Sequence, residues 1–128
     1  MIELEKISFR HENADVPSLK NVSLTIADGE CVLLCGESGS GKTTITRLIN
    51  GLIPHFYEGE LEGFAMVNGL NVTEAELYET AKLVGSVFQN PRSQFFCVDT
   101  TSELAFGCEN MGMPENEVHA CVDAAAKE

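Results

Sequence analysis

The sequence has 128 residues, of which 44% are hydrophobic and 22% are charged, a composition typical of a soluble folded domain. Twenty acidic residues against eight lysines and arginines give a formal net charge of −12 at pH 7. This charge argues against direct binding to nucleic acid or to anionic lipid, because like charges repel at long range. An anionic ligand would need a site that creates its own positive potential.

The cysteine pattern indicates a reducing compartment. Five cysteines are present, the count is odd and no Cys-x-x-Cys pair occurs, and the N-terminus lacks a basic-then-apolar signal peptide. Cys31 and Cys35 lie four apart in an apolar run, so we interpret them as core residues of a strand and not as metal ligands. No apolar stretch approaches the roughly 20 residues that a spanning helix requires, so a membrane role would need a partner.

The first third of the chain has the pattern of three strands. Residues 2–9 alternate apolar and polar side chains, which predicts a half-buried strand, and residues 10–18 predict a loop. Residues 21–26 alternate in the same way, and Asp28-Gly29 predicts a tight turn that pairs this strand with the next. That next strand is expected over 31–35, where the continuous apolar run is typical of a strand buried on both faces.

The remainder predicts more helix than strand. Ile45, Leu48, Ile49 and Leu52 recur at helical spacing after Lys42. Residues 58–71 predict short strands with a turn at 68–69, the pair Thr73 and Glu76 predicts a capping box for a helix over 74–81, and residues 83–88 predict a buried strand. Thr100 or Thr101 could cap one further helix, and Pro114 could start another. The chain stops within a helical pattern at 124–128, which we interpret as a sign of a fragment.

A phosphate-binding loop joins the third expected strand to the first expected helix. The pattern Gly-x-x-x-x-Gly-Lys-[Ser/Thr] is met by the run Gly36, Glu37, Ser38, Gly39, Ser40, Gly41, Lys42 and Thr43. The glycines let successive N–H groups turn inward towards an anion, and the helix N-terminus adds its dipole.

Each loop residue type has a role in holding a nucleotide. We expect Lys42 to reach the β- and γ-phosphates of ATP and the Thr43 hydroxyl to bind Mg²⁺, and we include Thr44 in the phosphate site. Ser38 and Ser40 either donate hydrogen bonds or are present because small residues fit a tight loop. The sequence therefore predicts a site for MgATP.

The strand, loop and helix, together with Val87-Phe88-Gln89-Asn90-Pro91, resemble the N-terminal half of an ABC-type ATPase domain. In this resemblance, which covers essentially the whole chain, Gln89 begins the Q-loop. The runs 51–59 and 89–96 look like those of the ATPase components of energy-coupling-factor importers for vitamins or metals. Some of these carry two ATPase domains in one polypeptide, and this chain is similar to the first of such a pair.

The resemblance implies an α/β fold: a P-loop NTPase core with a mixed sheet, an N-terminal antiparallel β-subdomain and the start of a helical subdomain. Residues 1–90 would form a partial ATP-binding core, and residues 91–128 the Q-loop segment and the beginning of the helical subdomain. The C-terminal half of the ATPase domain, with its second acidic motif and signature, would be absent. On this basis we expect weak nucleotide binding and negligible turnover by the chain alone.

The resemblance also implies roles for four further residues. Gln89 would contact Mg²⁺ and the attacking water, although it could instead cap a turn. His11 falls where such domains usually stack an aromatic residue on adenine, and the alternative is a solvated histidine at a strand end. Phe95 and Phe96 would either face a membrane partner or pack the helical subdomain against the sheet, and core packing is the more common outcome.

The function implied is ATP hydrolysis that energises import of a small solute, with Lys42 and Gln89 as catalytic residues. The implied partners are a transmembrane subunit and a second ATPase domain, without nucleic acid, at the cytoplasmic side of the membrane. One alternative is a soluble ABC-type ATPase that acts on ribosomes or DNA without a transmembrane partner. Another is a small-molecule kinase, which would need an acceptor lid that the sequence does not resemble.

Overall fold

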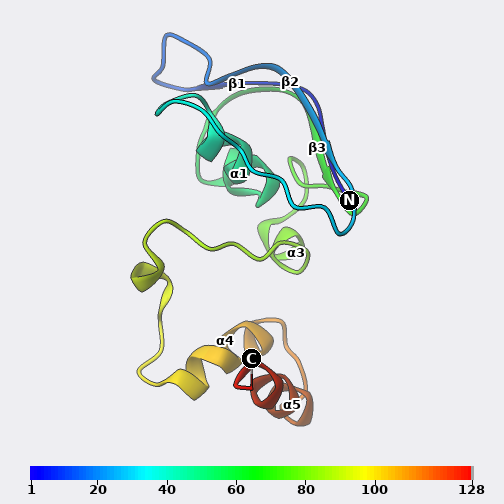
Figure 1. Ribbon diagram of the computed structural model, residues 1–128, viewed down its shortest axis with the longest axis vertical. Helices are drawn as coiled ribbons and strands as arrows, with labels where there is room; N and C mark the ends of the chain where they lie inside the picture. The colour runs from blue at the N-terminus through cyan, green and yellow to red at the C-terminus, as the bar shows by residue number, and fades with distance from the viewer. Residues whose placement is uncertain (128) are drawn as a thin grey trace. The chain divides into compact units, whose positions relative to one another are not determined.

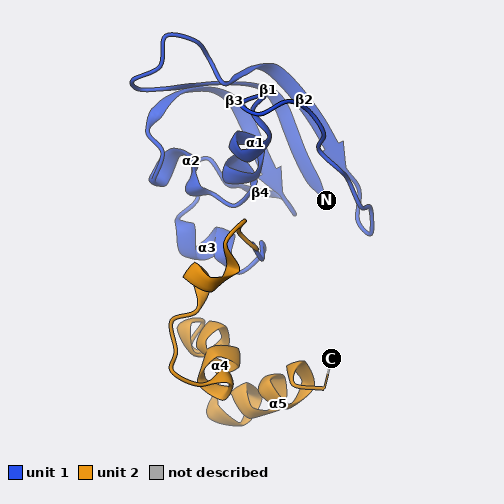
Figure 2. Ribbon diagram, turned by 60° about the vertical axis from the view of Figure 1, so that its left-hand side comes forward, with its two compact units in different colours: residues 1–86 blue, residues 87–128 orange. Residues whose placement is uncertain are grey.

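A computed structural model of the protein describes residues 1–127 and shows two compact units. The first unit comprises Met1–Ser86 and the second Val87–Glu128, coloured separately in Figure 2. Each unit is described by itself below.

The described strands of the first unit form an antiparallel sheet, so the mixed sheet expected from the sequence is not formed within residues 1–127. Within residues 1–127 the sheet has four strands in the order β2-β1-β3-β4, formed by β1 (Ile2–His11), β2 (Leu19–Ile26), β3 (Gly59–Val67) and β4 (Leu70–Asn71). The strands predicted near 2–9 and 21–26 are therefore confirmed. The turn predicted at 68–69 is also confirmed, since Asn68 and Gly69 both have positive φ, as a tight two-residue hairpin requires.

A bulge sets which side chains of β1 reach the core. Leu4, Ile7 and Phe9 are all buried, although a strict two-residue alternation would place Leu4 and Ile7 on opposite faces. The register shifts after Leu4 against β2 and after Glu5 against β3, and the extra residue returns Ile7 to the inner face. Gly63 permits this kink, because a Cβ there would lie 2.3 Å from the Glu5 carbonyl oxygen.

Helices cover the inner face of the sheet, as Figure 1 shows for α1. The helix α1 (Lys42–Ile49) contributes the fully buried Leu48, and α2 (Leu52–His55) contributes the fully buried Ile53. Both belong to one hydrophobic cluster with the inward residues of β1 and β3. Burying a side chain of this size stabilises the fold by roughly 1.5–3 kcal/mol, so these contacts fix α1 on the sheet.

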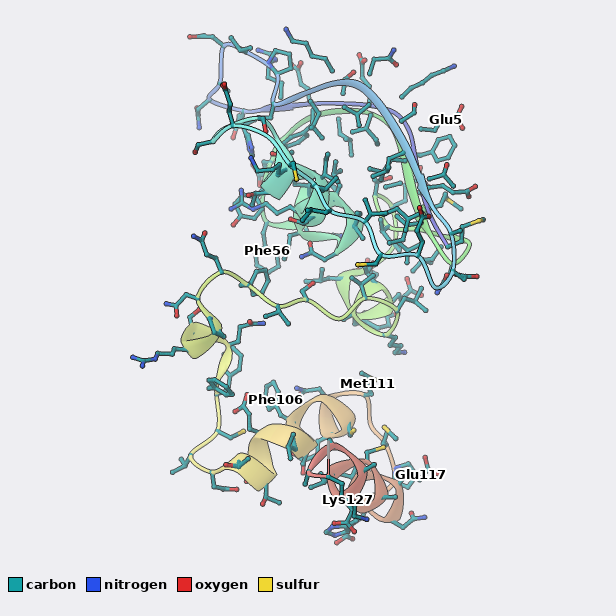
Figure 3. The ribbon with its side chains drawn as sticks, viewed as in Figure 1. Glu5, Phe56, Phe106, Met111, Glu117 and Lys127 are labelled. Carbon is teal, nitrogen blue, oxygen red and sulfur yellow. The ribbon has the colours of Figure 1, made fainter. Side chains whose placement is uncertain are left out.

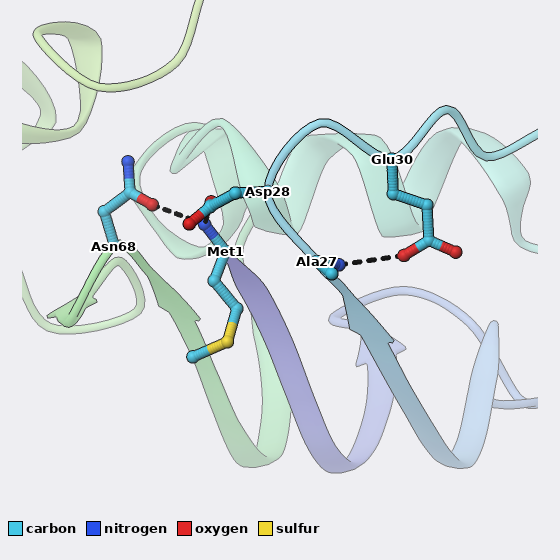
Figure 4. Close-up of polar contacts among 5 residues, drawn as sticks. All are labelled: Met1, Ala27, Asp28, Glu30 and Asn68. Carbon is cyan, nitrogen blue, oxygen red and sulfur yellow. Dashed lines mark hydrogen bonds and ion pairs between the residues drawn. The ribbon is translucent and has the colours of Figure 1, made fainter.

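Polar contacts join the edge of the sheet where β1 begins and β3 ends (Figure 4). The amino group of Met1 donates hydrogen bonds to Asp28 and to Asn68 Oδ1, the latter over 2.6 Å. The turn after β2 is closed by Glu30, whose Oε2 accepts from the Ala27 amide at 2.8 Å. The two bonds of Met1 tie the turns that follow β2 and β3 to the residue just before β1.

The helix predicted over 74–81 begins later than expected, as α3 (Leu77–Ala81). Its capping box is formed by Glu76 and Glu79, so the prediction of a box from Thr73 and Glu76 was wrong. The Thr73 hydroxyl instead donates to Asn71 Oδ1 at 2.7 Å, which closes the turn after β4. An Asx turn thus competes for the residue that the sequence pattern assigned to a cap.

Two predicted strands are not formed. Residues 31–35 and 83–88 carry no strand pairing, β2 pairs only with β1 in the described sheet, and Leu33 and Val87 are 84% and 88% exposed. Cys31 and Cys35 are exposed as well, so their interpretation as core residues is contradicted. An apolar run becomes a buried strand only where neighbouring strands accept its backbone hydrogen bonds, and residues 1–127 provide no such neighbour for either segment.

The second unit is helical, as predicted for the C-terminal third. It contains a 3₁₀ turn (Pro91–Gln94), α4 (Thr100–Asn110) and α5 (Glu115–Ala125). The cap of α4 is Asp99 rather than Thr100 or Thr101, because its Oδ1 accepts from the Ser102 amide at 2.9 Å. This backbone hydrogen bond is the main reason that the pKa of Asp99 is lowered.

Thr80 offers a test of the packing in the first unit. Its side chain is fully buried in α3, and its hydroxyl oxygen has no hydrogen-bond partner among the described residues. Because an unsatisfied buried polar group costs about 1–3 kcal/mol, we expect Thr80→Val to raise the free energy of unfolding by about 1 kcal/mol in urea titrations. Thr80→Ser is the control: it keeps the hydroxyl, loses a packed methyl and should destabilise. A Thr80→Val variant less stable than wild type would contradict the assignment.

Candidate phosphate-binding site

The predicted phosphate loop lies directly before α1 in the first unit. Its residues from Gly36 to Ser40 are exposed, and the glycines at 36, 39 and 41 have φ angles of +154°, +83° and +90°. Residues with a Cβ rarely adopt such φ angles. A Cβ on Gly36 would also lie 2.8 Å from Ser40 Oγ, so the loop depends on glycine for both conformation and space.

Lys42 folds back over this loop. Its Nζ donates to the carbonyl oxygens of Gly36 and Glu37 at 2.9 and 2.6 Å, and to Ser40 Oγ at 3.2 Å. All three acceptors are neutral, whereas a phosphate oxygen would add the attraction between opposite charges to its hydrogen bond with the ammonium. A phosphate oxygen can therefore replace these oxygens as the partner of the Lys42 ammonium.

The N-terminus of α1 has free hydrogen-bonding capacity for an anion. Gly41 occupies the cap position in the left-handed conformation, makes no side-chain cap bond, and the first turn contains no acidic residue. The first intrahelical amide bond is from Ile45 to the Gly41 carbonyl at 3.0 Å, so the preceding helical amides have no intrahelical acceptor. Such a helix start favours negative charge.

The two threonines after the lysine differ in position. Thr43 is exposed, and its hydroxyl is the kind of hard oxygen ligand that Mg²⁺ binds. Thr44 is 6% exposed, so its side chain packs into the first unit and only its backbone amide suits a phosphate. Among residues 1–127 no group of three His, Cys, Asp or Glu side chains is arranged to hold a metal. The Thr43 hydroxyl thus stays the expected magnesium ligand of the loop.

Gly41 links the loop to the sheet. A Cβ built on it would lie 2.7 Å from both the Ser18 carbonyl oxygen and Leu19 Cδ2, so the loop approaches the start of β2 closely. The Ser18 amide in turn donates to the Phe9 carbonyl at 2.8 Å. Phe9 precedes His11 by two residues, so one run of contacts connects the phosphate loop to the end of β1.

His11 lies at that end of β1, opposite Gly59 of β3. Its ring makes edge-on contacts with Phe9 and Tyr57, at centroid distances of 4.7 and 6.4 Å and interplanar angles of 80° and 77°. Neither ring is stacked parallel on the imidazole. His11 also borders an open hollow of about 350 Å³ lined by residues 10–12 and 58–60, a position compatible with contact to a flat aromatic ligand.

Charges around this hollow are largely acidic. Arg10 donates to Glu60 Oε2 at 2.7 Å, and this hydrogen bond is the main cause that raises the pKa of Arg10. Glu12 and Glu58 line the same hollow. The arginine is thus engaged by a carboxylate, and the hollow itself does not favour phosphate.

Gln89 belongs to the second unit, where it is exposed just before the 3₁₀ turn. Its proposed contact with the nucleotide stays a prediction. Phe95 and Phe96 are 66% and 73% exposed, so the expected core packing of these rings is not seen within the unit. Phe96 stacks on Phe106, labelled in Figure 3, at 5.4 Å.

Sequence reasoning missed two contacts. The Arg47 guanidinium lies 3.9 Å from the centroid of the Tyr57 ring, and no spacing rule connects these residues. Glu103 accepts hydrogen bonds from the Phe96 and Cys97 amides at 3.0 and 2.8 Å. An acidic residue in the first turn of a helix was the available signal for the second contact.

Comparisons with known proteins identify the family of the chain. Residues 19–125 match the family model described as ABC transporter, and the chain belongs to the ABC transporter family. It is 55% identical over 118 residues to an ABC transporter ATP-binding protein of Treponema denticola. This alignment covers 92% of this chain and 24% of the Treponema protein. An ABC transporter ATP-binding protein of Pyrococcus abyssi is 44% identical over 118 residues, and that alignment covers 92% of this chain and 42% of the Pyrococcus protein. The chain therefore spans less than half the length of these relatives.

A solved structure supports the fold. It is the dimeric ATP-binding cassette MJ0796 in a post-hydrolysis state bound to ADP and Pi. The superposition has a TM-score of 0.73 at 23% sequence identity, and it covers 99% of this chain and 56% of the MJ0796 chain. The predicted α/β fold of a P-loop NTPase is thus confirmed. Within residues 1–127 no helix has the length and apolar character needed to cross a membrane.

The close approach at Gly41 generates a matched test. Gly41→Ala and Gly39→Ala both force alanine into a positive φ, which costs about 1–2 kcal/mol. The two variants differ in steric contact: a Cβ at 41 meets Ser18 and Leu19, whereas nothing lies within 4 Å of a Cβ at 39. We expect Gly41→Ala to lower the thermal unfolding midpoint by several degrees more than Gly39→Ala does. Equal shifts in calorimetric melts would show that the loop does not pack on Ser18 and Leu19.

Proposed function

We propose that this chain is the ATP-binding part of an ABC-type ATPase, with the nucleotide held by residues 36–44 and His11. The observation that carries the proposal is the uncapped start of α1 behind a glycine loop whose lysine contacts only neutral oxygens. This arrangement provides directed N–H groups, a helix dipole and a displaceable cation, which are the means by which proteins bind the phosphates of a nucleotide.

Binding would exchange the lysine's present partners for phosphate. Lys42 moves its Nζ from the carbonyls of Gly36 and Glu37 to the β- and γ-phosphate oxygens, and the exposed amides of the loop and of Lys42 to Thr44 donate to the same anion. Ser40 Oγ, already within reach of Lys42 Nζ, is available as a further donor. Mg²⁺, when bound through the Thr43 hydroxyl, neutralises charge on the phosphates.

The hydrolysis that we propose would be phosphoryl transfer to water, in which positioning and charge neutralisation supply most of the rate enhancement. We assign Lys42 to stabilising the charge that develops on the transferred group, and the side-chain amide of Gln89 to orienting the attacking water. An amide can both accept and donate hydrogen bonds, which suits contact with a water and a metal ion together. The assignment of residues 1–90 to a partial ATP-binding core, and of residues 91–128 to the Q-loop segment and the beginning of a helical subdomain, is part of this proposal.

The biological role that we propose is to energise import of a small solute, a vitamin or a metal ion, as in energy-coupling-factor transporters. The name ABC transporter ATP-binding protein, carried by the relatives, supports a transport role. The partners would be a transmembrane subunit and a second ATPase domain, at the cytoplasmic side of the membrane. The net charge of −12 disfavours the alternative of an ABC-type ATPase that acts on nucleic acid.

The first test is a calorimetric titration of MgATP and MgGTP into the purified chain. We expect Lys42→Ala to weaken MgATP binding at least tenfold, because it removes a charge-assisted contact to the phosphates. Lys82→Ala is the matched control, since the Lys82 ammonium interacts with the Tyr78 ring at 5.3 Å and lies outside the loop. It should bind as wild type does. Equal binding by Lys42→Ala and Lys82→Ala would remove the basis of the proposed site.

A further inference from the structure

Tyr57 connects His11 to the helix that follows the phosphate loop. The residue is half-buried and lies in the segment of chain that joins α2 to β3. Its amide donates to the Leu52 carbonyl at 3.1 Å, which fixes its backbone. The Tyr57 ring makes two contacts. Its centroid lies 6.4 Å from the centroid of the His11 ring and 3.9 Å from the Arg47 guanidinium carbon.

Arg47 lies in the last turn of α1, the helix that begins with Lys42 and Thr43. Leu48, its neighbour, is fully buried in the hydrophobic cluster, so the backbone that carries Arg47 is fixed on the sheet. A guanidinium at this distance over a tyrosine face is attracted by the ring quadrupole. The plane of the Tyr57 ring is therefore held by the same helix whose first turn would bind phosphate.

A second ring also contacts His11. Phe9 is fully buried and meets the imidazole edge-on at 4.7 Å, while Gly59, paired with His11 across the strands, has no side chain. A Cβ at 59 would lie 2.2 Å from the Arg10 carbonyl oxygen, so no side chain fits at this position. Within residues 1–127, Phe9 and Tyr57 are thus the two ring contacts of His11, and they come from different parts of the chain.

We propose that Tyr57 is a positioning residue for the base of the bound nucleotide: held by Arg47, it orients His11 so that the imidazole can stack on a purine. This inference rests on the proposed function, because it assumes that His11 contacts the base. An imidazole with one ring contact can still turn about its side-chain bonds, and a second edge-on contact limits that rotation. Pre-organising a stacking surface improves affinity because less side-chain entropy is lost on binding.

The test separates base affinity from phosphate affinity. MgATP and magnesium tripolyphosphate, which has no base, are titrated into wild type and Tyr57→Leu. We expect Tyr57→Leu to weaken MgATP binding about three- to tenfold, the range for loss of an aromatic contact, and to leave tripolyphosphate binding within about twofold. Tyr57→Phe keeps the ring and should bind MgATP as wild type does.

The chain offers a matched control in Tyr78, an exposed tyrosine that likewise meets a cation, Lys82. Tyr78→Leu should leave both affinities unchanged. A Tyr57→Leu variant that weakens both ligands equally, or neither, would overturn the proposal. Thermal unfolding of each variant checks that it is folded. The His11 ring signals in the NMR spectrum of the unliganded protein give a second readout, and they should shift in Tyr57→Leu and stay in place in Tyr78→Leu.

The same titrations distinguish this inference from the function on which it rests. If wild type binds tripolyphosphate and MgATP with equal affinity, and His11→Ala changes neither, the base contact assigned to His11 is wrong and the role of Tyr57 is excluded with it. If His11→Ala weakens MgATP selectively and Tyr57→Leu does not, the proposed function stands and the positioning role alone is overturned.

Discussion

The close approach of Gly41 to the start of β2 is the contact on which the candidate site depends. Because position 41 has no Cβ, the loop backbone can lie against the Ser18 carbonyl and the Leu19 side chain, and Ser18 is in turn bonded to Phe9. A loop held only by its own hydrogen bonds would have no defined position relative to the sheet. This contact places the phosphate end of the site against β1, the strand that ends in His11.

The helix α1 is the second connection between the two ends of the site. Its first turn presents unpaired amides, its middle buries Leu48 in the core, and its last turn places Arg47 over Tyr57. One helix of eight residues therefore carries both the proposed phosphate-binding amides and the contact to Tyr57. On the proposed function, helix geometry would fix the spacing between the phosphate and base contacts, because a helix changes less under thermal motion than a loop does.

The sequence predicted most features that depend on local chemistry, although it misplaced the caps of α3 and α4, and it missed those that depend on distant partners. The glycine loop, the Asn68-Gly69 turn and the helices after Asp99 and Pro114 are encoded by residues a few positions apart. Apolar runs at 31–35 and 83–88 carry no record of which strand will pair with them, so their assignment as buried strands did not hold for residues 1–127. The contact of Arg47 with Tyr57 depends on the path of α2, which no periodic pattern of the chain specifies.

The negative net charge of the molecule opposes the binding of an anion at the phosphate loop. Arg10 is paired with Glu60 and Arg47 lies over Tyr57, whereas Lys42 contacts neutral oxygens. The loop must therefore attract phosphate against a formal net charge of −12. At physiological ionic strength the screening length is about 8 Å, so repulsion from remote carboxylates is weakened while contacts to Lys42 and to the loop amides are not. Short-range donation by the loop, rather than the field of the whole chain, then decides whether a triphosphate binds.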